Sequence, residues 1–395
     1  MIRHVFKLMW NKKKQHLLLV IEIFFSFLVI FAVATMGVYF YRNYHKPMGL
    51  QDKDVWVVNF YNFNTSLSGD SLTAFHNLVR NEVVSLPKVV DAGYSSNMIP
   101  FGNVENSTSF TGTGKEVGHV LDYFVDDHYA NVLGMTLVEG RWFNKTDDAA
   151  ASQAILINQE LERQAFGGES AVGKLVGSDK DLRRKRIVGV VADVKVNGDY
   201  RESLPSLWYR ADTGAHKDII NTLLVKVSPD ADATFEGQLF KLLTNRFKGA
   251  DIGISHLSDV RSRSNAQALI PVIIFGIIAV FLIVNVAFGL FGVLWYNINK
   301  RRSEIGLRRA MGATGWSVAT QLWGETLVLA TFALVVGSFF AVQFPLLHVF
   351  DLPSWVYILA LIFAILFVYV LVTICSLYPG KQAAGIYPAV ALHED

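Results

Sequence analysis

The stretch LIPVIIFGIIAVFLIVNVAFGLFGVLWY, Leu269–Tyr296, decides the fold of this 395-residue chain. It holds no charged side chain, and Asn285 is its one strongly polar residue. A helix crosses the hydrocarbon core of a bilayer with about 20 apolar residues, so the stretch predicts a transmembrane helix. The composition agrees, because 52% of the residues are hydrophobic and 18% are charged, whereas an average soluble domain is about 25% charged. A wholly soluble protein is therefore excluded.

Three further apolar stretches are long enough to span a membrane: Leu17–Tyr41, Leu322–Val342 and Trp355–Cys375. Glu22 interrupts the stretch that begins at Leu17, and Glu325 interrupts the stretch that begins at Leu322. The first stretch is not expected to be a cleavable signal peptide, because its apolar run is too long and no small-residue cleavage site precedes the folded part. Four membrane spans are therefore predicted.

Basic residues gather on one side of these spans. Cytoplasmic loops carry an excess of Lys and Arg, and here the basic segments are the one before the first span and the one between the second and third. The connection 344–354 has no basic residue. Both termini and the connection 297–317 are therefore expected in the cytoplasm, with the region 42–268 outside. The basic residues are Arg3, Lys7, Lys12, Lys13 and Lys14 in the first segment and Lys300, Arg301, Arg302, Arg308 and Arg309 in the second.

Residues 1–16 allow two interpretations. Val5, Phe6, Leu8, Met9 and Trp10 mix with the basic residues, which suits an amphipathic helix on the inner membrane surface. A simple positive-inside anchor explains the lysines equally well.

The region outside has two similar halves, each read as strand, helix and strand. In the first half, a β-rich stretch precedes Asp70, a good N-cap, and a helix with one apolar face. The same order returns later, where Asp232 begins the second helix. Two such units predict one split α+β domain, at about 45–99 and about 216–258. The expected strands are Val55–Phe60, one that begins at Val89, Thr222–Val227 and Ile252–Leu257.

Residues of about 100–215 separate these halves and are expected to form an inserted β-rich subdomain. Ala154–Ile157 and Arg186–Val196 read as strands, and Asn158 caps a short helix between them. Helical stretches through Tyr44 after the first span, and from Ser258 before the second, predict a stiff stalk.

The fold class expected from these features is a membrane protein with four transmembrane α-helices and a large α+β extracytoplasmic domain inserted between helices 1 and 2. The expected boundaries are 1–16 for the cytoplasmic basic amphipathic segment, 17–44 for helix 1 and its stalk, 45–265 for the extracytoplasmic domain, 266–297 for helix 2, 298–315 for a cytoplasmic connection, 316–344 for helix 3, 354–378 for helix 4 and 379–395 for a cytoplasmic tail.

Motifs for catalysis or cofactor binding are weak. GESAVGKL, Gly168–Leu175, nearly matches a P-loop, but Leu175 replaces the hydroxyl residue that binds magnesium, so a glycine turn is the better interpretation. Asp126, Asp127 and His128 lack a spaced second ligand pair and are read as a solvated loop. The chain is therefore expected to be non-catalytic, with no cofactor or metal of its own.

Glu22 and Glu325 are informative, because an acid within a span costs at least about 2.5 kcal/mol on insertion. Both are expected to face the protein interior or an aqueous crevice. One interpretation is an ion or proton pathway. The other is an interhelical hydrogen bond or a position near the interface, and it is favoured because the other spans carry no charged residue for a relay.

The most specific signal is RRSEIGLRRAMGAT, Arg301–Thr314, in the connection between the second and third spans. Glu304 and Arg308 have the spacing of a helical ion pair, and Gly312 is placed to end the helix. In this segment the chain resembles the MacB/FtsX-type ABC permease family, whose E-I-G-x-x-R-A-x-G-A pattern forms the coupling helix that docks on the ATPase. The residues to which the resemblance assigns coupling are Glu304, Ile305, Gly306, Arg308, Arg309, Ala310, Gly312 and Ala313.

The resemblance extends along nearly the whole chain. QLWGET places Glu325 where the family usually has an acid. The outer stretches Asp126–Phe143 and Ile155–Val176 are similar to the family's periplasmic core domain, and the second accounts for the glycine turn. The end of the chain is similar to the family's Pro-x-x-Ala-Leu-x-x-Glu ending, with His393 where an arginine is frequent. The tail-motif residues are Pro388, Ala391, Leu392 and Glu394.

The resemblance implies an ABC transporter permease subunit, a multi-pass protein of the bacterial cytoplasmic (inner) membrane. Since the cytoplasmic parts of the sequence hold no Walker motif, ATP–Mg is expected on a separate ABC ATPase subunit. The other implied partners are a second permease chain (homodimer or heterodimer), membrane lipids and a periplasmic adaptor, but no nucleic acid. The implied mechanism is mechanotransmission, in which ATPase motion reaches the outer domain through the spans and drives export or extraction of a peptide, antibiotic or lipoprotein.

Two other classes stay open. An FtsX-like regulatory membrane protein would activate an extracytoplasmic hydrolase, or signal, without transport, although the outer domain of that branch is usually smaller. A membrane receptor or enzyme would carry a catalytic constellation in its outer domain, and the sequence shows none. Under the transport hypothesis, replacing Glu304 or Arg309 should uncouple ATP hydrolysis from transport while the chain still inserts.

Overall fold

The computed structural model describes residues 13–63, 66–112, 115–177, 184–211, 220–347, 349 and 352–385. The tail motif at 388–394 and most of the segment 1–16 lie outside these residues. The chain divides into two compact units, Met1–Arg42 with Leu269–Asp395, and Asn43–Ala268. The first is the helical unit and the second the sheet unit.

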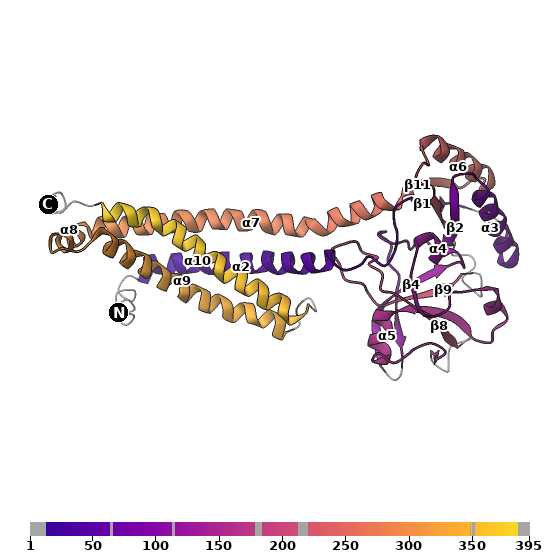
Figure 1. The fold of residues 1–395 in the computed structure, drawn as a ribbon, viewed down its shortest axis with the longest axis horizontal. Helices are drawn as coiled ribbons and strands as arrows, with labels where there is room; N and C mark the ends of the chain where they lie inside the picture. Colours follow the sequence, from indigo (N-terminus) through magenta and orange to yellow (C-terminus); the bar gives the residue numbers. More distant parts are fainter. Residues whose placement is uncertain are drawn as a thin grey trace. The chain divides into compact units, whose positions relative to one another are not determined.

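Long helices make up most of the helical unit (Figure 1): α2 (Lys13–Tyr44), α7 (Leu257–Lys300), α9 (Gly315–Leu346) and α10 (Ser354–Ala384). All four of these helices contain an apolar stretch long enough to cross a membrane, so the four predicted spans are confirmed. The expected helical extensions are present, because α2 continues to Tyr44 and α7 begins at Leu257. The short helix α8 (Arg302–Ala310) connects α7 to α9.

The core of the helical unit joins aromatic side chains of α2 to small residues of α9 and α10. Phe27 is fully buried, and a Cβ added at Gly337 on α9 would lie 2.5 Å from its ring carbon Cδ1. Small residues allow this close approach of the helices. In lipid the hydrophobic effect does not drive helices together, so transmembrane helices associate through such close packing. The other small residues of this core are Ala330, Ala333 and Ala341 on α9, and Ala360 and Ala364 on α10.

The fourth helix is longer than the sequence predicted. Hydropathy ends the span at Tyr378, but α10 continues to Ala384, so the expected tail at 379–395 begins as helix. A Cβ added at Gly380 would lie 3.6 Å from the Cβ of Ala319 on α9. This packing of small residues supports a helical turn that apolarity alone does not reveal.

One mixed sheet organises the sheet unit, in the order β11-β1-β10-β2-β4-β9-β6-β8-β5, with β3 on β4 and β7 on β8. The strands are β1 (Val55–Tyr61), β2 (Val89–Ser95), β3 (Ser107–Thr111), β4 (Glu116–Val125), β5 (Leu137–Gly140), β6 (Gln153–Asn158), β7 (Leu175–Val176), β8 (Lys185–Val191), β9 (Ser206–Arg210), β10 (Thr222–Val227) and β11 (Asp251–His256). The helices are α3 (Gly69–Val84), α4 (Tyr129–Leu133), α5 (Gln159–Phe166) and α6 (Ala233–Arg246), with a 3₁₀ turn at Lys145–Ala149. The predicted α+β class is confirmed.

Both strand–helix–strand halves contribute to the β11-β1-β10-β2 end of this sheet, where the three pairings are antiparallel. Helices α3 and α6 bury their apolar faces in one core with these strands, as Val79 and Leu239 show. The N-cap of α3 is Ser68, whose backbone N–H is bonded to Ser71 Oγ at 3.3 Å, and not Asp70 as predicted. Asp70 lies in the first turn, where its charge suits the helix dipole.

The expected subdomain at 100–215 is not separate, because its strands extend the same sheet through the pairing of β4 with β2 at Ser95 and Val125. Its strand β8 also ends at Val191, short of the predicted Val196. The chain leaves the strand because the Asp193 carboxylate accepts hydrogen bonds from Asn158 Nδ2 at 3.0 Å and from Glu160 N at 2.8 Å. These bonds fix the start of α5, which Asn158 caps as predicted.

Burial of His76 should make the sheet unit sensitive to acid. The imidazole on α3 is 8% exposed, and its ring centroid lies 4.8 Å from that of Tyr94. Burial lowers the pKa of His76 from 6.5 to about 4. Between these values the unfolded chain binds the proton more tightly than the folded chain, so stability rises with pH in this window and is lost as the pH falls.

At about pH 5 this group alone should lower the free energy of unfolding of the sheet unit by about 2 kcal/mol relative to neutral pH. Calorimetry of the purified chain should show a lower melting temperature at acid pH than at neutral pH. The decrease should be smaller in the His76→Gln variant. An equal fall in both proteins would contradict the role given to His76.

Candidate functional site

The connection between α7 and α9 is the site that the sequence singles out. Helix α8 ends in a left-handed turn, since Gly312 has a φ of +97°. The N–H groups of Gly312 and Ala313 donate to carbonyls of the last turn of α8 at 3.1 and 3.0 Å, an arrangement that satisfies the end of a helix. Thr314 then caps α9, its Oγ1 accepting from Ser317 N at 3.2 Å. The chain therefore reverses tightly between two well-bonded helices.

The two faces of α8 differ in their surroundings. Ile305 is 6% exposed and Gly306 is buried. Leu307 and Met311 are 52% and 74% exposed, while Ala310 is exposed as well. The residues that pack with Ile305 come from three other helices and are Ile298 of α7, Val318 and Leu322 of α9, and Ala383 of α10.

Five side chains form a polar ring that links α8 to α9. Arg308 Nη2 donates to Glu304 Oε1 at 2.6 Å, which is the predicted helical pair. Arg301 donates to Glu304 through Nε at 3.0 Å and to Glu325 through Nη1 at 3.2 Å. Gln321 completes the ring, because it accepts from Arg308 Nη1 at 2.7 Å and donates to Glu325 Oε1 at 3.2 Å.

The polar ring gives Glu325 an interhelical partner, as the structural interpretation of that acid expects. The hydrogen bond to Glu304 and the charge of Glu325 raise the pKa of Arg301, although burial acts in the opposite direction. Arg301 and Gln321 were not among the predicted site residues. Their spacing was a usable signal. Arg301 lies three residues before Glu304, and Gln321 lies four residues before Glu325, and side chains at these separations are neighbours on a helix.

Arg309 connects α8 to α10. Its Nη1 donates to the backbone oxygen of Ala384, the last residue of α10. The start of α9 passes close by, since a Cβ added at Gly315 would lie 2.9 Å from the same oxygen. Polar contacts therefore attach α8 to α9 and α10, and apolar packing of Ile305 joins it to α7 as well.

Glu22 has a different environment. A Cβ added at Gly289 on α7 would lie 2.3 Å from Glu22 Oε2. That oxygen is buried without a hydrogen-bond partner among the described residues, and the same holds for Ser26 Oγ, one turn later on α2. Within the described part of the chain, Glu22 Oε2 therefore does not form the interhelical hydrogen bond that was considered for it. Glu22 lies against Gly289 of α7, whereas Glu325 is bonded to Arg301.

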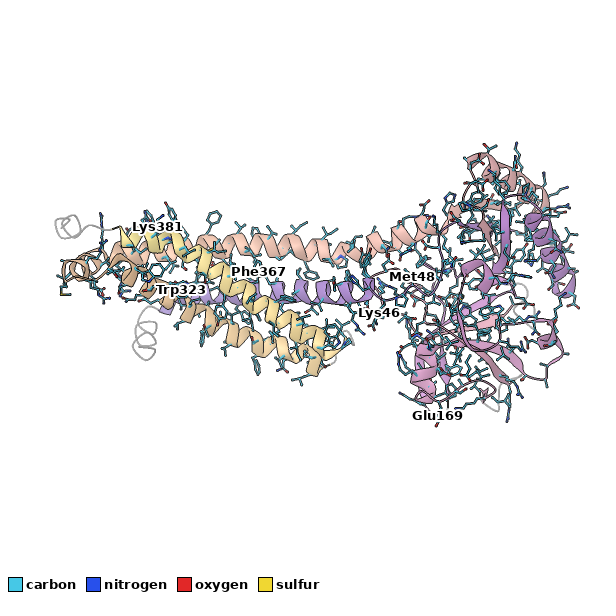
Figure 2. The ribbon with its side chains drawn as sticks, in the orientation of Figure 1. Lys46, Met48, Glu169, Trp323, Phe367 and Lys381 are labelled. Carbon is cyan, nitrogen blue, oxygen red and sulfur yellow. The ribbon has the colours of Figure 1, made fainter. Side chains whose placement is uncertain are left out.

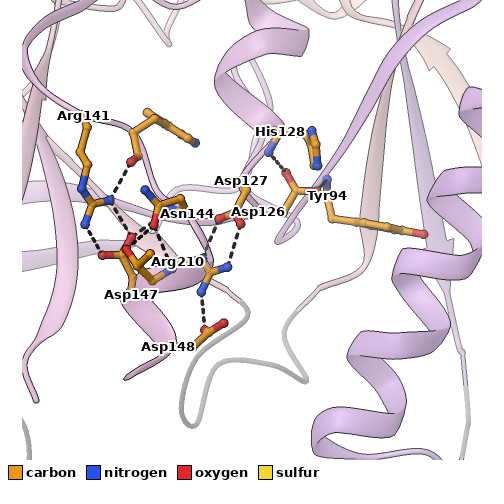
Figure 3. A network of polar contacts seen from close by, with 11 residues as sticks. Tyr94, Asp126, Asp127, His128, Arg141, Asn144, Asp147, Asp148 and Arg210 are labelled. Atoms are coloured by element: carbon orange, nitrogen blue, oxygen red, sulfur yellow. Dashed lines mark hydrogen bonds and ion pairs between the residues drawn. The ribbon is translucent and has the colours of Figure 1, made fainter. Parts of the chain in front are cut away.

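A buried network in the sheet unit surrounds Arg210 (Figure 3). The Arg210 side chain is 3% exposed, and it donates to both carboxylate oxygens of Asp127, at 2.6 and 2.7 Å. Asp126 accepts from the backbone N–H groups of Tyr94 at 2.8 Å and His128 at 2.9 Å. Residues 126–128 form a loop as predicted, but its acids are not solvated, because Asp126 and Asp127 bond to Tyr94 and Arg210, which are distant in the sequence. Among the described residues, no group of three or more His, Cys, Asp or Glu side chains could hold a metal ion.

A second network in the sheet unit, which we call the joint cluster, centres on Asp199. Arg261 in the first part of α7 donates to Asp199 Oδ1 at 2.6 Å and to Asp52 Oδ1 at 2.8 Å. Asn265, one helical turn later, accepts from Asp199 N at 2.8 Å. The loop before β9 and the chain before β1 are thus both bonded to α7. The cluster consists of Asn43, Asp52, Lys195, Asp199, Arg261 and Asn265.

Lys195 extends the joint cluster to α2. The side chain is buried, and its Nζ donates to the backbone oxygens of Asn43 at 2.7 Å and Asp199 at 3.3 Å. Burial lowers the pKa of this ammonium group, with the Asp199 charge acting against that effect. Since Asn43 lies in the last turn of α2, one short loop holds the ends of both helices that enter the sheet unit.

The near P-loop is a glycine turn in the structure. Gly168 and Gly173 have φ values of +92° and +84°, and Gly173 N donates to Ile187 O on β8 at 2.8 Å. The segment therefore serves as a connection from α5 to β7.

Two family descriptions match the chain. The MacB-like periplasmic core domain matches residues 17–239 and so covers more than half of the sequence. The FtsX-like permease C-terminal region matches residues 276–388. The first match spans α2 and most of the sheet unit, and the second spans most of α7 with all of α8, α9 and α10.

Curated relatives are longer than this chain. The macrolide export ATP-binding/permease protein MacB of Aggregatibacter actinomycetemcomitans is 26% identical over 260 residues, which cover 63% of this chain and 40% of the relative. MacB of Mannheimia succiniciproducens is 26% identical over 353 residues, which cover 84% of this chain and 51% of the relative. The chain therefore spans about half or less of the length of these relatives.

Solved structures of outer regions are also similar. The periplasmic region of MacB from Actinobacillus actinomycetemcomitans matches with a TM-score of 0.40 and 18% identity, covering 56% of this chain and 97% of that one. The extracellular domain of the ABC-type transporter YknZ from Gram-positive bacteria matches with a TM-score of 0.35 and 15% identity, covering 50% and 99%.

Proposed function

The chain belongs to the MacB/FtsX-type family of ABC transporter permeases, and we propose that it is a permease subunit that works by mechanotransmission. In this proposal a separate ABC ATPase binds ATP–Mg and docks on α8. Its motion passes through the helices to the sheet unit, which drives export or extraction of a cargo. The named relatives export macrolides, and an antibiotic, a peptide or a lipoprotein is the cargo class proposed for this chain.

One observation carries the proposal: α8 is firmly attached on one face and exposes apolar side chains on the other. Ile305 and the polar ring hold the helix to its neighbours, whereas Leu307 and Met311 are exposed. Exposed apolar side chains next to a basic segment suit a protein partner that buries them. A force applied to this face would therefore move α8 together with the helices it contacts.

The contacts suggest how the force travels. Arg301 would transmit it to Glu325 on α9, and Arg309 to the end of α10. Helix α7 is continuous from Leu257 to Lys300, so displacement of its Lys300 end would reach Arg261 near its other end. There the joint cluster would pass it to the loop at Asp199 and onward into the sheet.

The proposed assembly contains a second permease chain, membrane lipids and a periplasmic adaptor in addition to the ATPase. The chain is a multi-pass protein of the inner membrane. We propose that both termini and α8 lie in the cytoplasm and the sheet unit outside. The excess of Lys and Arg around α8 supports this orientation.

Replacing Leu307 of α8, or Met311 directly after it, should weaken ATPase binding. Leu307→Ala or Met311→Ala should each raise the dissociation constant about tenfold, because burial of such a side chain contributes about 1.5 kcal/mol or more. The ATPase is identified by co-purification from native membranes and then titrated onto the purified permease. Leu175→Ala, which truncates an exposed leucine of the sheet unit, is the matched control. Equal binding by the Leu307 and Leu175 variants, or no ATPase with the unaltered chain, would contradict the proposal.

A further inference from the structure

Helices α9 and α10 leave a groove of about 590 Å³ between them at the end next to α8. Figure 2 shows Trp323 and Lys381 at this end of the helical unit. The residues that matter to its chemistry are Trp316, Trp323, Thr373, Leu377, Lys381 and Ala384. We call it the α9/α10 groove.

The walls of the groove are mostly apolar, because the polar side chains of Thr320, Trp323 and Ser376 are each bonded to α9 or α10. Trp323 Nε1 donates to Thr373 Oγ1 at 3.3 Å. Thr320 Oγ1 donates to Trp316 O at 2.9 Å, and Ser376 Oγ to Thr373 O at 2.9 Å. The groove therefore offers little to a polar small molecule and suits a hydrocarbon chain.

Lys381 places one positive charge at the edge of this apolar groove. The side chain is exposed and makes no hydrogen bond or ion pair within the described part of the chain. Its neighbour Trp316 is 76% exposed. Tryptophan and lysine together are typical of the level at which lipid head groups meet a membrane protein.

The groove also opens onto a continuous apolar face. Leu377 lies in the groove, and Ile374 and Val370 continue from it along α10, with exposed fractions of 60%, 61% and 50%. An acyl chain could pass from the groove along this face without leaving apolar surroundings. A folded protein partner would bring polar groups that the groove cannot bond.

We propose that the α9/α10 groove binds one anionic phospholipid of the cytoplasmic leaflet, its acyl chain against the two tryptophans and its phosphate at Lys381. The inference rests on the proposed orientation of the chain but not on the presence of an ATPase. It has a consequence for coupling, because Ala384 lines the groove and also accepts the hydrogen bond from Arg309 of α8. Lipid in the groove would hold the end of α10 where that bond forms.

Native mass spectrometry of the purified full chain tests the proposal, with phosphatidylglycerol as the anionic probe and phosphatidylcholine as the neutral one. The unaltered chain should retain phosphatidylglycerol preferentially. Lys381→Gln should weaken that binding about fivefold, the effect of removing one basic residue near an anionic lipid. Thr320→Phe, which fills the groove without changing its charge, should weaken binding of both lipids.

Lys300→Gln is the matched control, because Lys300, like Lys381, lies in the last turn of a membrane-spanning helix. It contacts the Tyr296 ring and does not line the groove. It should bind phosphatidylglycerol as the unaltered chain does. Equal retention of the two lipids by the unaltered chain, or equal losses in the Lys381 and Lys300 variants, would overturn the proposal. So would cross-links from a photoreactive residue at Trp323 to another protein chain in place of lipid. None of these outcomes depends on ATP hydrolysis, so each is distinct from failure of the proposed function.

Discussion

A chain with Arg301→Ala should insert normally and bind its ATPase, yet the equilibrium between the resting and the ATP-driven positions of the sheet unit should shift about tenfold toward the resting position. Arg301 is the side chain that joins Glu304 on α8 to Glu325 on α9. Its removal leaves Glu325 within a span without its cation. The two side chains are 20% and 26% exposed, so loss of this charged hydrogen bond costs about 1.5 kcal/mol. The bond from Arg308 to Gln321 and the packing of Ile305 would still join α8 to α9, so the force would reach α9 weakened.

Pulsed electron spin resonance can measure this loss without knowledge of the cargo. Spin labels are placed through Lys241→Cys and Leu346→Cys, in a chain whose own cysteine is replaced by Cys375→Ala. Trapping nucleotide on the ATPase should change the label distance in the otherwise unaltered chain, and in a clearly smaller fraction of molecules with Arg301→Ala. Lys300→Ala, which removes a neighbouring charge outside the polar ring, should behave as the parent does. A full distance change with Arg301→Ala would contradict the role of the polar ring.

Arg261→Ala should open the joint cluster and loosen the loop that holds both entering helices. Arg261 bonds Asp52 and Asp199, whose side chains are only 14% and 11% exposed. Removal of the guanidinium leaves two nearly buried carboxylates without their cation, at a cost of about 3 kcal/mol. Backbone amides of the loop 193–202 should then exchange with deuterium about a hundredfold faster, because local opening becomes that much more frequent.

Hydrogen–deuterium exchange of the full chain in detergent measures this effect. Arg246→Ala is the matched control, because its pair with Glu82 has side chains 47% and 32% exposed. Exposed pairs contribute about 1 kcal/mol at most, so exchange near α6 should rise only slightly. Unchanged protection of the loop in Arg261→Ala would show that the joint cluster does not hold it.

The fold was largely predictable because its strongest determinants are local. Long apolar runs predict the spans, and strand and helix periodicity predicts both halves of the split domain. The ends of elements were less predictable. The last turn of α10 depends on Gly380 packing near Ala319 on another helix, and the end of β8 depends on the bonds of Asp193 to the start of α5.

The candidate site was predictable as a segment but not as a set of contacts. The order of acid, small residues and glycine between Arg301 and Thr314 indicates α8 and its Glu304–Arg308 pair. The bond from Arg309 reaches a backbone oxygen at Ala384, which no side-chain pattern can indicate. Asp127 was misread for a similar reason, because its partner Arg210 lies 83 residues later. Pairs this far apart meet only when the sheet has formed.

The side of the membrane on which α8 lies is the most direct test of mechanotransmission from a cytoplasmic ATPase to an outer sheet unit. Ser303 on α8 and Lys241 on α6 are both exposed, and each is changed to cysteine separately in the Cys375→Ala chain. A membrane-impermeant maleimide is then added to intact cells. The Lys241→Cys chain should react at once, and the Ser303→Cys chain only after the membrane is permeabilised. Reaction of both chains from outside intact cells would contradict force transmission across the bilayer.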